Sequence, residues 1–346
     1  MNATTQSMPH AALQTLPMQA ILQTTYGGAE QLQLGTHARP VIGKAEVLIR
    51  VRAAGMDRGT WHLMAGKPYL MRLALGFRGP RNPVPGLDVA GTVVEVGAAV
   101  TRFKVGDEVF GISKGSFAEY ACAREDKLAM KPTNFSFEQA AVTGVSGLTA
   151  LQALRDAGKV QAGQRVLIIG ASGGVGSYAV QLAKAFGAEV TAVCSAAKRE
   201  RVLALGASRV IDYATEDFSS GDARYDLILD IAGNSPLGRL RKVLSPTGTI
   251  VFVGGEDGGA LTGGMGRQLG GVLRSLFSKQ RFVMKPPNEN AADLEVLREL
   301  AEAGKFTPAL DSTWPLAQVP DAMRHLVAGK VAGKLAITVT APPARG

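Results

Sequence analysis

The chain has 346 residues, of which 46% are hydrophobic and 19% are charged. This composition is typical of a globular protein and excludes a disordered chain, a collagen-like chain and a small disulfide framework. Because the chain is longer than a single hydrophobic core usually allows, we expect two domains.

The formal net charge is +9, with 38 Lys and Arg residues scattered along the chain. This charge could attract an anionic cofactor or simply keep the protein in solution. Because we find no dense basic cluster and no apolar run long enough to cross a bilayer, we expect neither a nucleic acid nor a membrane as partner. Cys122 and Cys194 are far apart, and the chain does not begin like a signal peptide. We therefore predict a soluble, cytoplasmic protein.

The segment from residue 18 to about 135 contains short strand-like runs separated by turn-forming residues. The runs are residues 47–55, 88–97, 107–111 and 117–123. Between them lie GK, VGD and the proline-rich RGPRNPVPG. This spacing predicts a barrel-like antiparallel domain.

The pattern changes after Pro132. Ser136 is the expected N-cap of a helix that begins FEQAA, and a second helix through residues 148–158 should end at Gly158. From Gln164 to about Gly255, strand runs alternate with helical runs, which predicts a parallel sheet covered by helices. The strand runs are 165–170, 189–195, 209–213, 225–231 and 249–255, and the helical runs are 173–187, 198–206 and 237–244.

The last part of the chain has two further helical runs, 291–304 and 320–329, each with a C-terminal glycine. Residues 334–340 are a final strand that could return to the first domain. The basic, amphipathic segment 267–282 is either a solvated helix or a border of the cleft or of a partner surface.

The stretch RVLIIGASGGVGSYAVQ joins a buried strand to an amphipathic helix through a glycine-rich turn. Gly173 and Gly174 would let backbone N–H groups approach a pyrophosphate, and Gly176 would permit close packing of helix and strand. Ala171 occupies the place of the first glycine of the usual fingerprint. We predict that residues 171–176, which are Ala171, Ser172, Gly173, Gly174, Val175 and Gly176, bind a dinucleotide. The alternative is a tight turn without a ligand.

The end of the second strand of this unit distinguishes NADPH from NADH. An NAD site usually has an acidic residue there, which accepts a hydrogen bond from the ribose 2′-hydroxyl. This chain has Cys194 and Ser195, followed by Lys198 and Arg199, which could pair with a 2′-phosphate. We therefore expect NADPH in preference to NADH, unless these cations form only the solvated start of the next helix.

Several motifs together resemble one family. GLDVAGTVVEVG, GDEVFG, SGLTALQAL, ASGGVG, VIDY and VGG, in this order, resemble the medium-chain dehydrogenase/reductase superfamily. The similarity is to its zinc-independent, quinone oxidoreductase-like branch, often described as NAD(P)-dependent alcohol dehydrogenase, and extends from about residue 18 to residue 340.

The resemblance implies an α/β protein with a GroES-like, β-rich catalytic domain and a Rossmann domain with a doubly wound parallel sheet. We expect the catalytic domain to be discontinuous, at 18–135 and 306–340, with the Rossmann domain at 136–305. Residues 1–17 would be a loosely ordered N-terminus and 341–346 a tail. The active site would lie in the cleft between the domains. Pairing of Rossmann sheet edges in this family implies a homodimer.

The resemblance also implies individual cofactor contacts. In NADPH-using members, the Ser and Lys of a segment similar to CSAAK and the Tyr of VIDY hold the 2′-phosphate, which corresponds to Ser195, Lys198 and Tyr213. Residues similar to Thr149, Gly254 and Lys334 lie near the nicotinamide or the phosphates. Tyr213 could equally be an ordinary aromatic residue at a strand end.

Zinc-dependent members of the superfamily have a Cys in the segment that corresponds to AAGMDRGTWH and a His-Glu pair in a G-H-E-x-x-G segment. Here Asp57 stands at the Cys position, and Leu87 and Asp88 replace His-Glu. A substitute site of Asp57, His62 and Asp88 is the weaker alternative. We expect no zinc, because the ligands that would let zinc polarise an alcohol are missing.

Without a metal, the easier reaction is hydride transfer from NADPH to an acceptor that is already electrophilic. We therefore predict an NADPH-dependent oxidoreductase whose small-molecule substrate is a quinone or an α,β-unsaturated carbonyl compound. Candidate catalytic hydrogen-bond donors are Asp57, His62 and Tyr69, each of which could have a purely structural role. The alternatives are an alcohol or carbonyl dehydrogenase and a non-catalytic NADPH-binding sensor or interaction protein.

Overall fold

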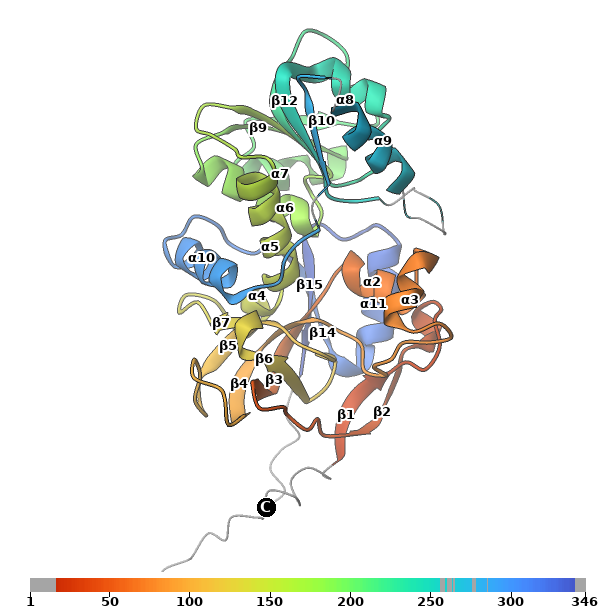
Figure 1. Ribbon diagram of the computed structural model, residues 1–346, viewed down its shortest axis with the longest axis vertical. Coiled ribbons are helices and arrows are strands. Elements are labelled where there is room, and N and C mark those ends of the chain that lie inside the picture. The colour runs from red at the N-terminus through yellow and green to blue at the C-terminus, as the bar shows by residue number, and fades with distance from the viewer. Residues whose placement is uncertain are drawn as a thin grey trace, which may run out of the picture.

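The computed structural model describes residues 17–255, 259, 263, 265–275, 278–284 and 286–339. The molecule is elongated and is built on two main sheets, one toward each end (Figure 1). The expected loose N-terminus lies outside the described residues except for Pro17, which begins strand β1, and the expected tail lies outside them entirely.

The first main sheet has seven strands in the order β14-β15-β3-β4-β5-β7, with β6 paired to β3. Its strands are β3 (Glu46–Met56), β4 (Asp88–Val96), β5 (Glu108–Ile112), β6 (Tyr120–Arg124), β7 (Leu128–Met130), β14 (Leu310–Pro315) and β15 (Lys334–Thr338). Neighbouring strands are antiparallel, as predicted, except that β14 and β15 are parallel. Because β15 pairs with β3, both ends of the chain contribute to this sheet. A small antiparallel pair, β1 (Pro17–Leu22) and β2 (Gln33–Ala38), forms a separate sheet, and β1 is linked to the segment before β6 by a bridge between Ala20 and Ala118.

The second main sheet has six strands in the order β10-β9-β8-β11-β12-β13, all parallel. Its strands are β8 (Arg165–Ile169), β9 (Glu189–Cys194), β10 (Arg209–Asp212), β11 (Tyr225–Asp230), β12 (Leu244–Phe252) and β13 (Arg281–Met284). This is the strand order of a Rossmann fold, and the order reverses between β8 and β11. In such sheets a ligand binds at the carboxyl ends of the strands beside the reversal. The predicted fold class is confirmed.

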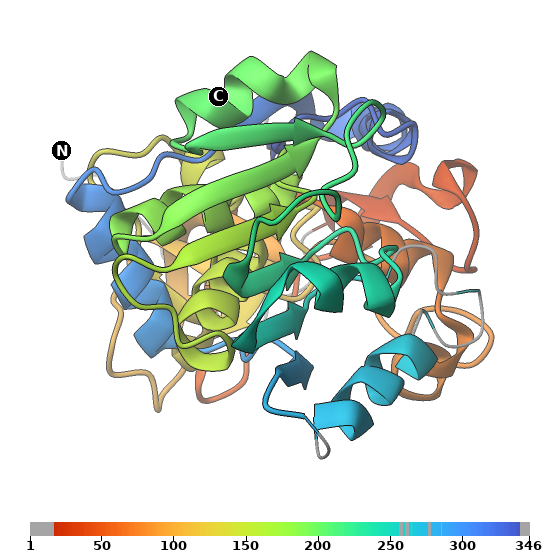
Figure 2. The same ribbon diagram turned by 90° about the horizontal axis from the view of Figure 1, so that it is seen from above.

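Helices cover the parallel sheet and connect it to the first sheet (Figure 2). The α-helices of the described residues are α2 (Arg58–Ala65), α3 (Arg72–Leu75), α4 (Phe137–Ala141), α5 (Gly144–Gln152), α6 (Gly174–Ala185), α7 (Arg199–Ala204), α8 (Leu237–Val243), α9 (Met265–Ser275), α10 (Ala291–Glu302) and α11 (Val319–Val327). Of these, α4 and α11 pack on strands of the first sheet, and α11 also contacts α2. Helix α6 packs on β8 and β9, and α5 packs on α6. None of the helices in the described part of the chain has the length and apolar character needed to cross a bilayer.

Local sequence signals explain where individual helices begin and end. Ser136 caps α4 as predicted, because its hydroxyl accepts from Gln139 N while the Gln139 side chain accepts from Ser136 N. The predicted second helix starts earlier, at Gly144, and its last turn, Ala153–Ala157, widens into a π-helix before Gly158.

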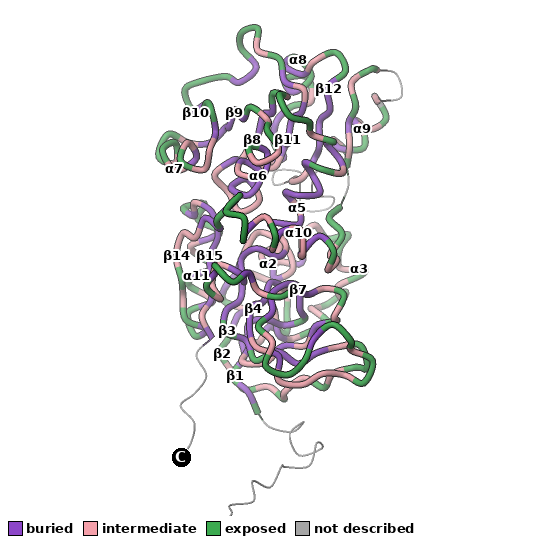
Figure 3. The backbone as a smooth tube through the Cα atoms, turned by 90° about the vertical axis from the view of Figure 1, so that its left-hand side faces the viewer, coloured by how far each residue is buried: buried purple, intermediate pink, exposed green. Residues whose placement is uncertain are grey.

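Helix α6 has the apolar face that its sequence predicts. Ala179, Leu182 and Ala183 are buried, and Val175 and Phe186 pack against the same core. Gly187, which follows the helix, has a φ of +81°, a left-handed conformation that glycine adopts without strain. Buried residues follow the strands of both main sheets (Figure 3), so each sheet has a hydrophobic core that fixes the strand ends around the site.

Candidate active site at the glycine-rich turn

The glycine-rich turn joins β8 to α6 at the point where the strand order reverses. Gly170 has a φ of +87°, which favours glycine at this position. A Cβ added at Gly176 would lie 2.2 Å from the carbonyl oxygen of Gly170, so only glycine lets the helix approach the strand this closely. No side chain of the described residues caps the N-terminus of α6. Its first N–H groups therefore suit a pyrophosphate, and binding of a dinucleotide at this turn remains a prediction.

A buried cluster of charged and polar groups lies against this turn. The Nζ atom of Lys334 is 2.9 Å from Asp57 Oδ2, 3.4 Å from Asp88 Oδ2 and 3.0 Å from Ser146 Oγ. The side chains of Lys334 and Asp88 are 1% and 2% exposed. We call Asp57, Asp88, Ser146 and Lys334 the lysine cluster. Its members come from four parts of the chain: β15, the start of α2, the start of β4, and α5.

The lysine cluster touches the turn directly. A Cβ added at Gly174 would lie 3.0 Å from Lys334 Cδ and 3.4 Å from Ser146 Oγ. The neighbouring residue, Gly333, donates its N–H to the Ser172 carbonyl at 2.9 Å. Strand β15 therefore brings a buried ammonium group to the N-terminal end of α6, beside the predicted pyrophosphate site.

Each acidic member has a second role. Asp57 is the N-cap of α2, because its Oδ1 accepts from Thr60 N at 3.0 Å. Asp88 Oδ1 accepts from Val145 N at 2.7 Å, which links β4 to α5. Backbone N–H groups therefore orient both carboxylates. The oriented carboxylates in turn hold the Lys334 ammonium at a defined position.

Burial and charge shift the pKa values of the cluster in different directions. Burial raises the pKa of Asp88 to about 7, despite the opposing effect of the Lys334 ammonium. For Asp57, burial is outweighed by the Lys334 ammonium and by hydrogen bonds, so its pKa is lowered. Burial lowers the pKa of Lys334, but the effect of the Asp57 and Asp88 carboxylates is larger, so the pKa is raised. Near neutral pH, the charge of the cluster thus depends on one proton on Asp88.

Asp88→Asn is expected to flatten the dependence of stability on pH. Unfolded Asp88 loses its proton near its ordinary pKa of 3.8, whereas the folded carboxyl keeps its proton up to about pH 7. Ionisation between these values favours the unfolded state, so stability falls as pH rises. From about pH 5 to pH 7, the free energy of unfolding should fall by about 2 kcal/mol more in the wild type than in Asp88→Asn, measured by denaturant titration.

The control is Asp222→Asn, which changes an exposed carboxyl group in the same way. Its pH profile should follow that of the wild type. Parallel profiles for the wild type and Asp88→Asn would show that Asp88 ionises normally in the folded protein.

The lysine cluster also bears on whether a zinc ion fits. By the resemblance to zinc-dependent relatives, Asp57 stands at the position of the Cys ligand, Leu87 at that of the His ligand and Asp88 at that of the Glu. Here both carboxylates contact the Lys334 ammonium. His62 Nδ1 is 2.9 Å from the Lys67 carbonyl oxygen and does not join them. Within the residues that the structure describes, no group of three or more His, Cys, Asp or Glu is placed to hold a metal. The donor set does not suit tetrahedral zinc, because a cationic side chain occupies the space between the carboxylates.

The predicted 2′-phosphate residues gather at the carboxyl ends of β9 and β10. Ser195 follows β9 directly, and Tyr213 N donates to the Cys194 carbonyl at 3.2 Å. Tyr213 is 67% exposed, and Arg199 is also exposed. Lys198 Nζ donates to the carbonyls of Val331 at 2.7 Å and Gly329 at 3.3 Å. A phosphate bound by Lys198 would take the place of these two bonds.

The remaining predicted cofactor residues lie on the elements around the turn. Thr149 lies in α5, where its hydroxyl donates to the Val145 carbonyl at 2.7 Å. Gly254 follows β12, and a Cβ there would lie 1.9 Å from the Ile231 carbonyl oxygen. Both positions therefore have a structural explanation, and their contact with a cofactor remains a prediction.

Of the three catalytic candidates, the structure brings only Asp57 into the lysine cluster. His62 packs edge-on against Trp61, with ring centroids 4.8 Å apart. Tyr69 is 42% exposed and lies under the Arg72 guanidinium, 4.6 Å from the ring centroid. The catalytic roles of these residues remain predictions.

Sequence reasoning missed the roles of three residues around the turn. It weighed Asp88 only as a metal ligand, and it did not single out Ser146. It also missed Asp230 at the end of β11, whose fully buried carboxylate accepts from Arg267 Nη1 at 2.7 Å and from Gly233 N at 3.1 Å. Burial raises the pKa of Asp230 despite the Arg267 guanidinium. An acidic residue at the end of a strand run was the available signal for Asp230, and the signal for Ser146 was its place at the start of the motif SGLTALQAL.

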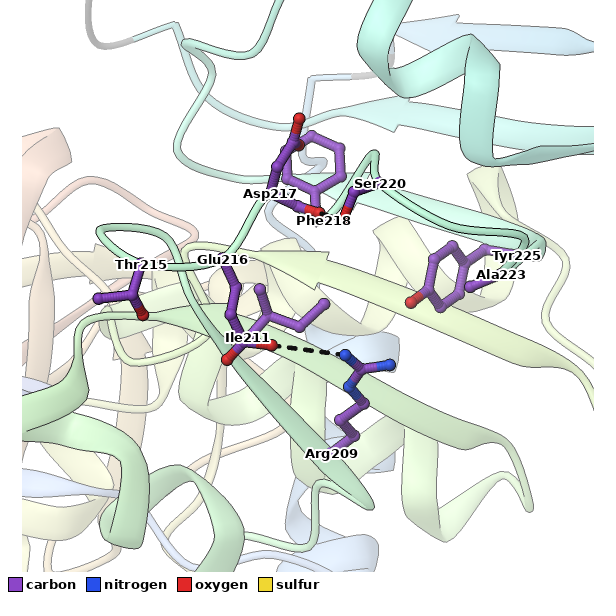
Figure 4. Close-up of a pocket in the computed structure, with 9 residues that line it drawn as sticks. All are labelled: Arg209, Ile211, Thr215, Glu216, Asp217, Phe218, Ser220, Ala223 and Tyr225. Atoms are coloured by element: carbon purple, nitrogen blue, oxygen red, sulfur yellow. Dashed lines mark hydrogen bonds and ion pairs between the residues drawn. The ribbon is translucent and has the colours of Figure 1, made fainter.

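A separate pocket of about 240 Å³ lies along β10 and the loop to β11 (Figure 4). Its lining includes Arg209, Glu216 and Asp217, and it shares no residue with the lysine cluster or the glycine-rich turn. We therefore do not assign the cofactor or the acceptor to this pocket.

Comparison with known proteins agrees with this geometry. Residues 43–133 match a family model described as an alcohol dehydrogenase GroES-like domain, and residues 205–337 match one described as a zinc-binding dehydrogenase. The chain is 33% identical over 335 residues to a chloroplastic quinone-oxidoreductase homolog of Spinacia oleracea, which covers 92% of this chain and 98% of the relative.

Two further similarities are informative. The chain is 34% identical over 342 residues to a chloroplastic NADPH-dependent alkenal/one oxidoreductase of Arabidopsis thaliana, covering 92% of this chain and 79% of that protein. The solved structure of the quinone oxidoreductase from Coxiella burnetii matches with a TM-score of 0.79 and 29% identity, covering 94% and 100% of the two chains.

The chain therefore belongs to the medium-chain dehydrogenase/reductase superfamily, in its quinone oxidoreductase-like branch. It is an NAD(P)H-dependent oxidoreductase. The family resemblance noted in the sequence is confirmed.

Proposed function

We propose that the protein uses NADPH to reduce quinones or α,β-unsaturated carbonyl compounds, without a zinc ion. The main observation in support is the position of Lys334, whose ammonium contacts Asp57 and Asp88 at 2.9 and 3.4 Å. The resemblance implies that zinc-dependent relatives have a Cys ligand at the position of Asp57 and a His-Glu pair at Leu87 and Asp88. With a lysine in that place, an acceptor that is already electrophilic is the substrate class that best fits the site.

NADPH, when bound, supplies the hydride. A quinone that accepts a hydride and one proton becomes a hydroquinone, and an enone that accepts them becomes a saturated ketone. The proton can come from water, so a dedicated acid is not required. The protein must place the acceptor beside the nicotinamide and keep water away from the nicotinamide.

The residues of the chain divide this task. The N-terminus of α6 binds the pyrophosphate through backbone N–H groups. Lys334 adds a positive charge beside the turn. Its ammonium is fixed in position because it contacts Asp57 and Asp88. Asp230, fixed by Arg267, holds the loop after β11 through Gly233 N. We also propose a homodimer formed through an edge of the parallel sheet, which light scattering would test.

The function is tested by following NADPH oxidation, through the nicotinamide absorbance, by chelator-treated protein. The acceptors are ortho- and para-quinones, enones and simple aldehydes, with NADH and an alcohol plus NADP⁺ as controls. We expect turnover of quinones or enones that survives chelation and is faster with NADPH. Chelator-sensitive alcohol oxidation would favour a zinc dehydrogenase, and tight NADPH binding without turnover would favour a sensor or interaction protein.

Ser195→Asp is expected to reverse the preference for NADPH. The new carboxylate would repel the 2′-phosphate and could accept a hydrogen bond from the 2′-hydroxyl of NADH. Hydrogen bonds to charged groups contribute more free energy than those between neutral groups. We therefore expect kcat/KM for NADPH, divided by kcat/KM for NADH, to fall by about 10- to 100-fold.

The matched control is Ser208→Asp. Ser208 is exposed and Ser195 is half-buried, but Ser208 precedes β10 and therefore lies at the amino end of the same parallel sheet. Its coenzyme ratio should be that of the wild type. An equal fall in both variants would mean that the effect is one of net charge, and would contradict a specific role of Ser195.

A further inference from the structure

The segment after α2 exposes several large apolar side chains. Leu70, Leu73 and Phe77 are 50%, 69% and 77% exposed. Leu70 and Leu73 lie in successive short turns, Tyr69–Met71 and α3, and Phe77 follows Gly76, which has a φ of +125°. Such side chains usually pack inside a protein, so a group of three at one surface points to a surface that contacts something apolar.

Helix α9 presents a second apolar face. Gly271 packs on the sheet, since a Cβ there would lie 2.9 Å from the Phe252 ring. Leu269 and Leu273, one helical turn apart, are 51% and 62% exposed. The helix is therefore held on its sheet by one side while its leucines lie on the solvent side.

The elements that carry these side chains lie on the same side of the molecule. Figures 1 and 2 both show α9 close to the α2–α3 region, although each belongs to a different sheet unit. The chain just before α9 also contacts the chain just before α3, because a Cβ at Gly263 would lie 3.0 Å from Pro68. We call Leu70, Leu73, Phe77, Leu269 and Leu273 the apolar rim.

The two stretches of sequence that carry the apolar rim have charge of one sign. No Asp or Glu occurs between Asp57 and Asp88, whereas Lys67, Arg72, Arg78 and Arg81 all fall in that interval. Likewise, residues 258–288 contain no acid. Arg78 and Arg81 are exposed beside Phe77. An anionic surface therefore complements this region.

We propose that the apolar rim docks the protein on an anionic lipid bilayer. Leucine and phenylalanine side chains would enter the boundary between headgroups and acyl chains, and Arg78 and Arg81 would face the lipid phosphates. The sequence led us to expect no membrane partner, because it has no apolar run that could span a bilayer. Peripheral docking needs no such run.

The same charges argue against a second copy of the chain as the occupant. A symmetric contact through this surface would bring Arg78 and Arg81 of two copies together, and like charges oppose such a contact. The proposal is independent of the reaction, because it requires neither the cofactor nor the acceptor.

Sedimentation with lipid vesicles tests the proposal. The wild type should bind vesicles of phosphatidylcholine and phosphatidylglycerol mixed three to one, and bind pure phosphatidylcholine weakly. Arg78→Gln with Arg81→Gln should lower the partition coefficient about 30-fold, because each basic residue at a lipid surface contributes about fivefold. Leu73→Ser with Phe77→Ser should lower it by at least about tenfold, because burial of both apolar side chains is lost.

Two double variants serve as matched controls. Val41 and Val105 are 62% and 61% exposed, so Val41→Ser with Val105→Ser removes similar apolar area elsewhere. Arg224→Gln with Lys305→Gln removes two exposed charges elsewhere. Both should bind the mixed vesicles within about threefold of the wild type, since neither pair belongs to the rim.

Three results would overturn the proposal. One is equal binding of the wild type to both kinds of vesicle, or to neither. Another is a change of oligomeric state in the rim variants with vesicle binding unaltered, which would make the rim a contact between copies. The third is that the rim variants bind vesicles like the wild type but have a higher KM, measured without vesicles, for an acceptor with a long apolar tail. This result would make the rim part of the substrate site. Because sedimentation needs no turnover, an inactive enzyme would not affect the outcome.

Discussion

Lys334→Met is expected to destabilise the protein and to weaken NADPH binding. The substitution keeps a long apolar stem but removes the ammonium that contacts Asp57, Asp88 and Ser146. The two carboxyl groups then remain buried without a counter-charge. Removing one partner of a buried ion pair typically costs about 3 to 5 kcal/mol, and we expect a loss of this size in the free energy of unfolding.

The effect on NADPH has a separate cause. The stem of Lys334 lies against Gly174 in the first turn of α6, so the ammonium adds positive charge beside the predicted pyrophosphate site. The hydrogen bonds of the ammonium go to Asp57, Asp88 and Ser146, so its effect on the cofactor is that of its charge. We expect the Kd for NADPH to rise by up to about tenfold when this positive charge is removed. Denaturant titration and the fluorescence of bound NADPH measure the two effects.

A triple variant separates these effects. Lys334→Met combined with Asp57→Asn and Asp88→Asn leaves no unpaired buried charge, and asparagine at position 57 still caps α2. This variant should regain most of the stability but not the NADPH affinity. If Lys334→Met alone is as stable as the wild type, the lysine cluster is not the buried ion pair described here. If the triple variant also recovers affinity, Lys334 affects the cofactor only through the fold.

Gly176→Ala is expected to disrupt the cofactor site from the other side. The added Cβ would lie 2.2 Å from the Gly170 carbonyl oxygen and 2.7 Å from Ala171 Cα, and both of these are backbone atoms. Since side-chain rotation cannot relieve the contact, α6 must move away from β8. Overpacking of this kind costs about 3 kcal/mol, and the displaced N–H groups should weaken NADPH binding by at least about tenfold.

Gly238→Ala is the matched control for this substitution. Gly238 lies in α8, where an added Cβ meets no atom within 4 Å. Alanine has the higher helix propensity, so the control should be up to about 1 kcal/mol more stable than the wild type, with unchanged affinity. An unchanged Kd in Gly176→Ala would contradict the assignment of the pyrophosphate to this turn. Far-ultraviolet circular dichroism would confirm that both variants are folded.

Features that depend on neighbouring residues could be predicted from the sequence. The alternation of strand and helix runs indicated the parallel sheet, and Ser136 and Gly187 marked helix ends that the structure confirms. The glycine-rich turn was also accessible, because backbone conformation and close approach depend on the few residues within it. The family resemblance followed from the order of such local motifs.

The environment of the side chains could not be predicted in this way. Lys334 and Asp57 are 277 residues apart in the chain, and they meet only because β15 pairs with β3. The sequence placed Lys198 at a phosphate, whereas the fold brings its ammonium within 2.7 Å of the Val331 carbonyl. His62 and Tyr69 follow Asp57 closely in the sequence, yet α2 and the turn after it direct them to other contacts.

Local patterns thus determined the fold class, the glycine-rich turn and the family. The tertiary structure decided which ionisable groups became neighbours and how far each was removed from water. Asp88 shows the physical reason, since a carboxyl with an ordinary pKa of 3.8 has a pKa of about 7 once it is buried. Burial arises from strands and helices distant in the chain, and for Asp88 it shifts the pKa by more than any of the surrounding charges and hydrogen bonds.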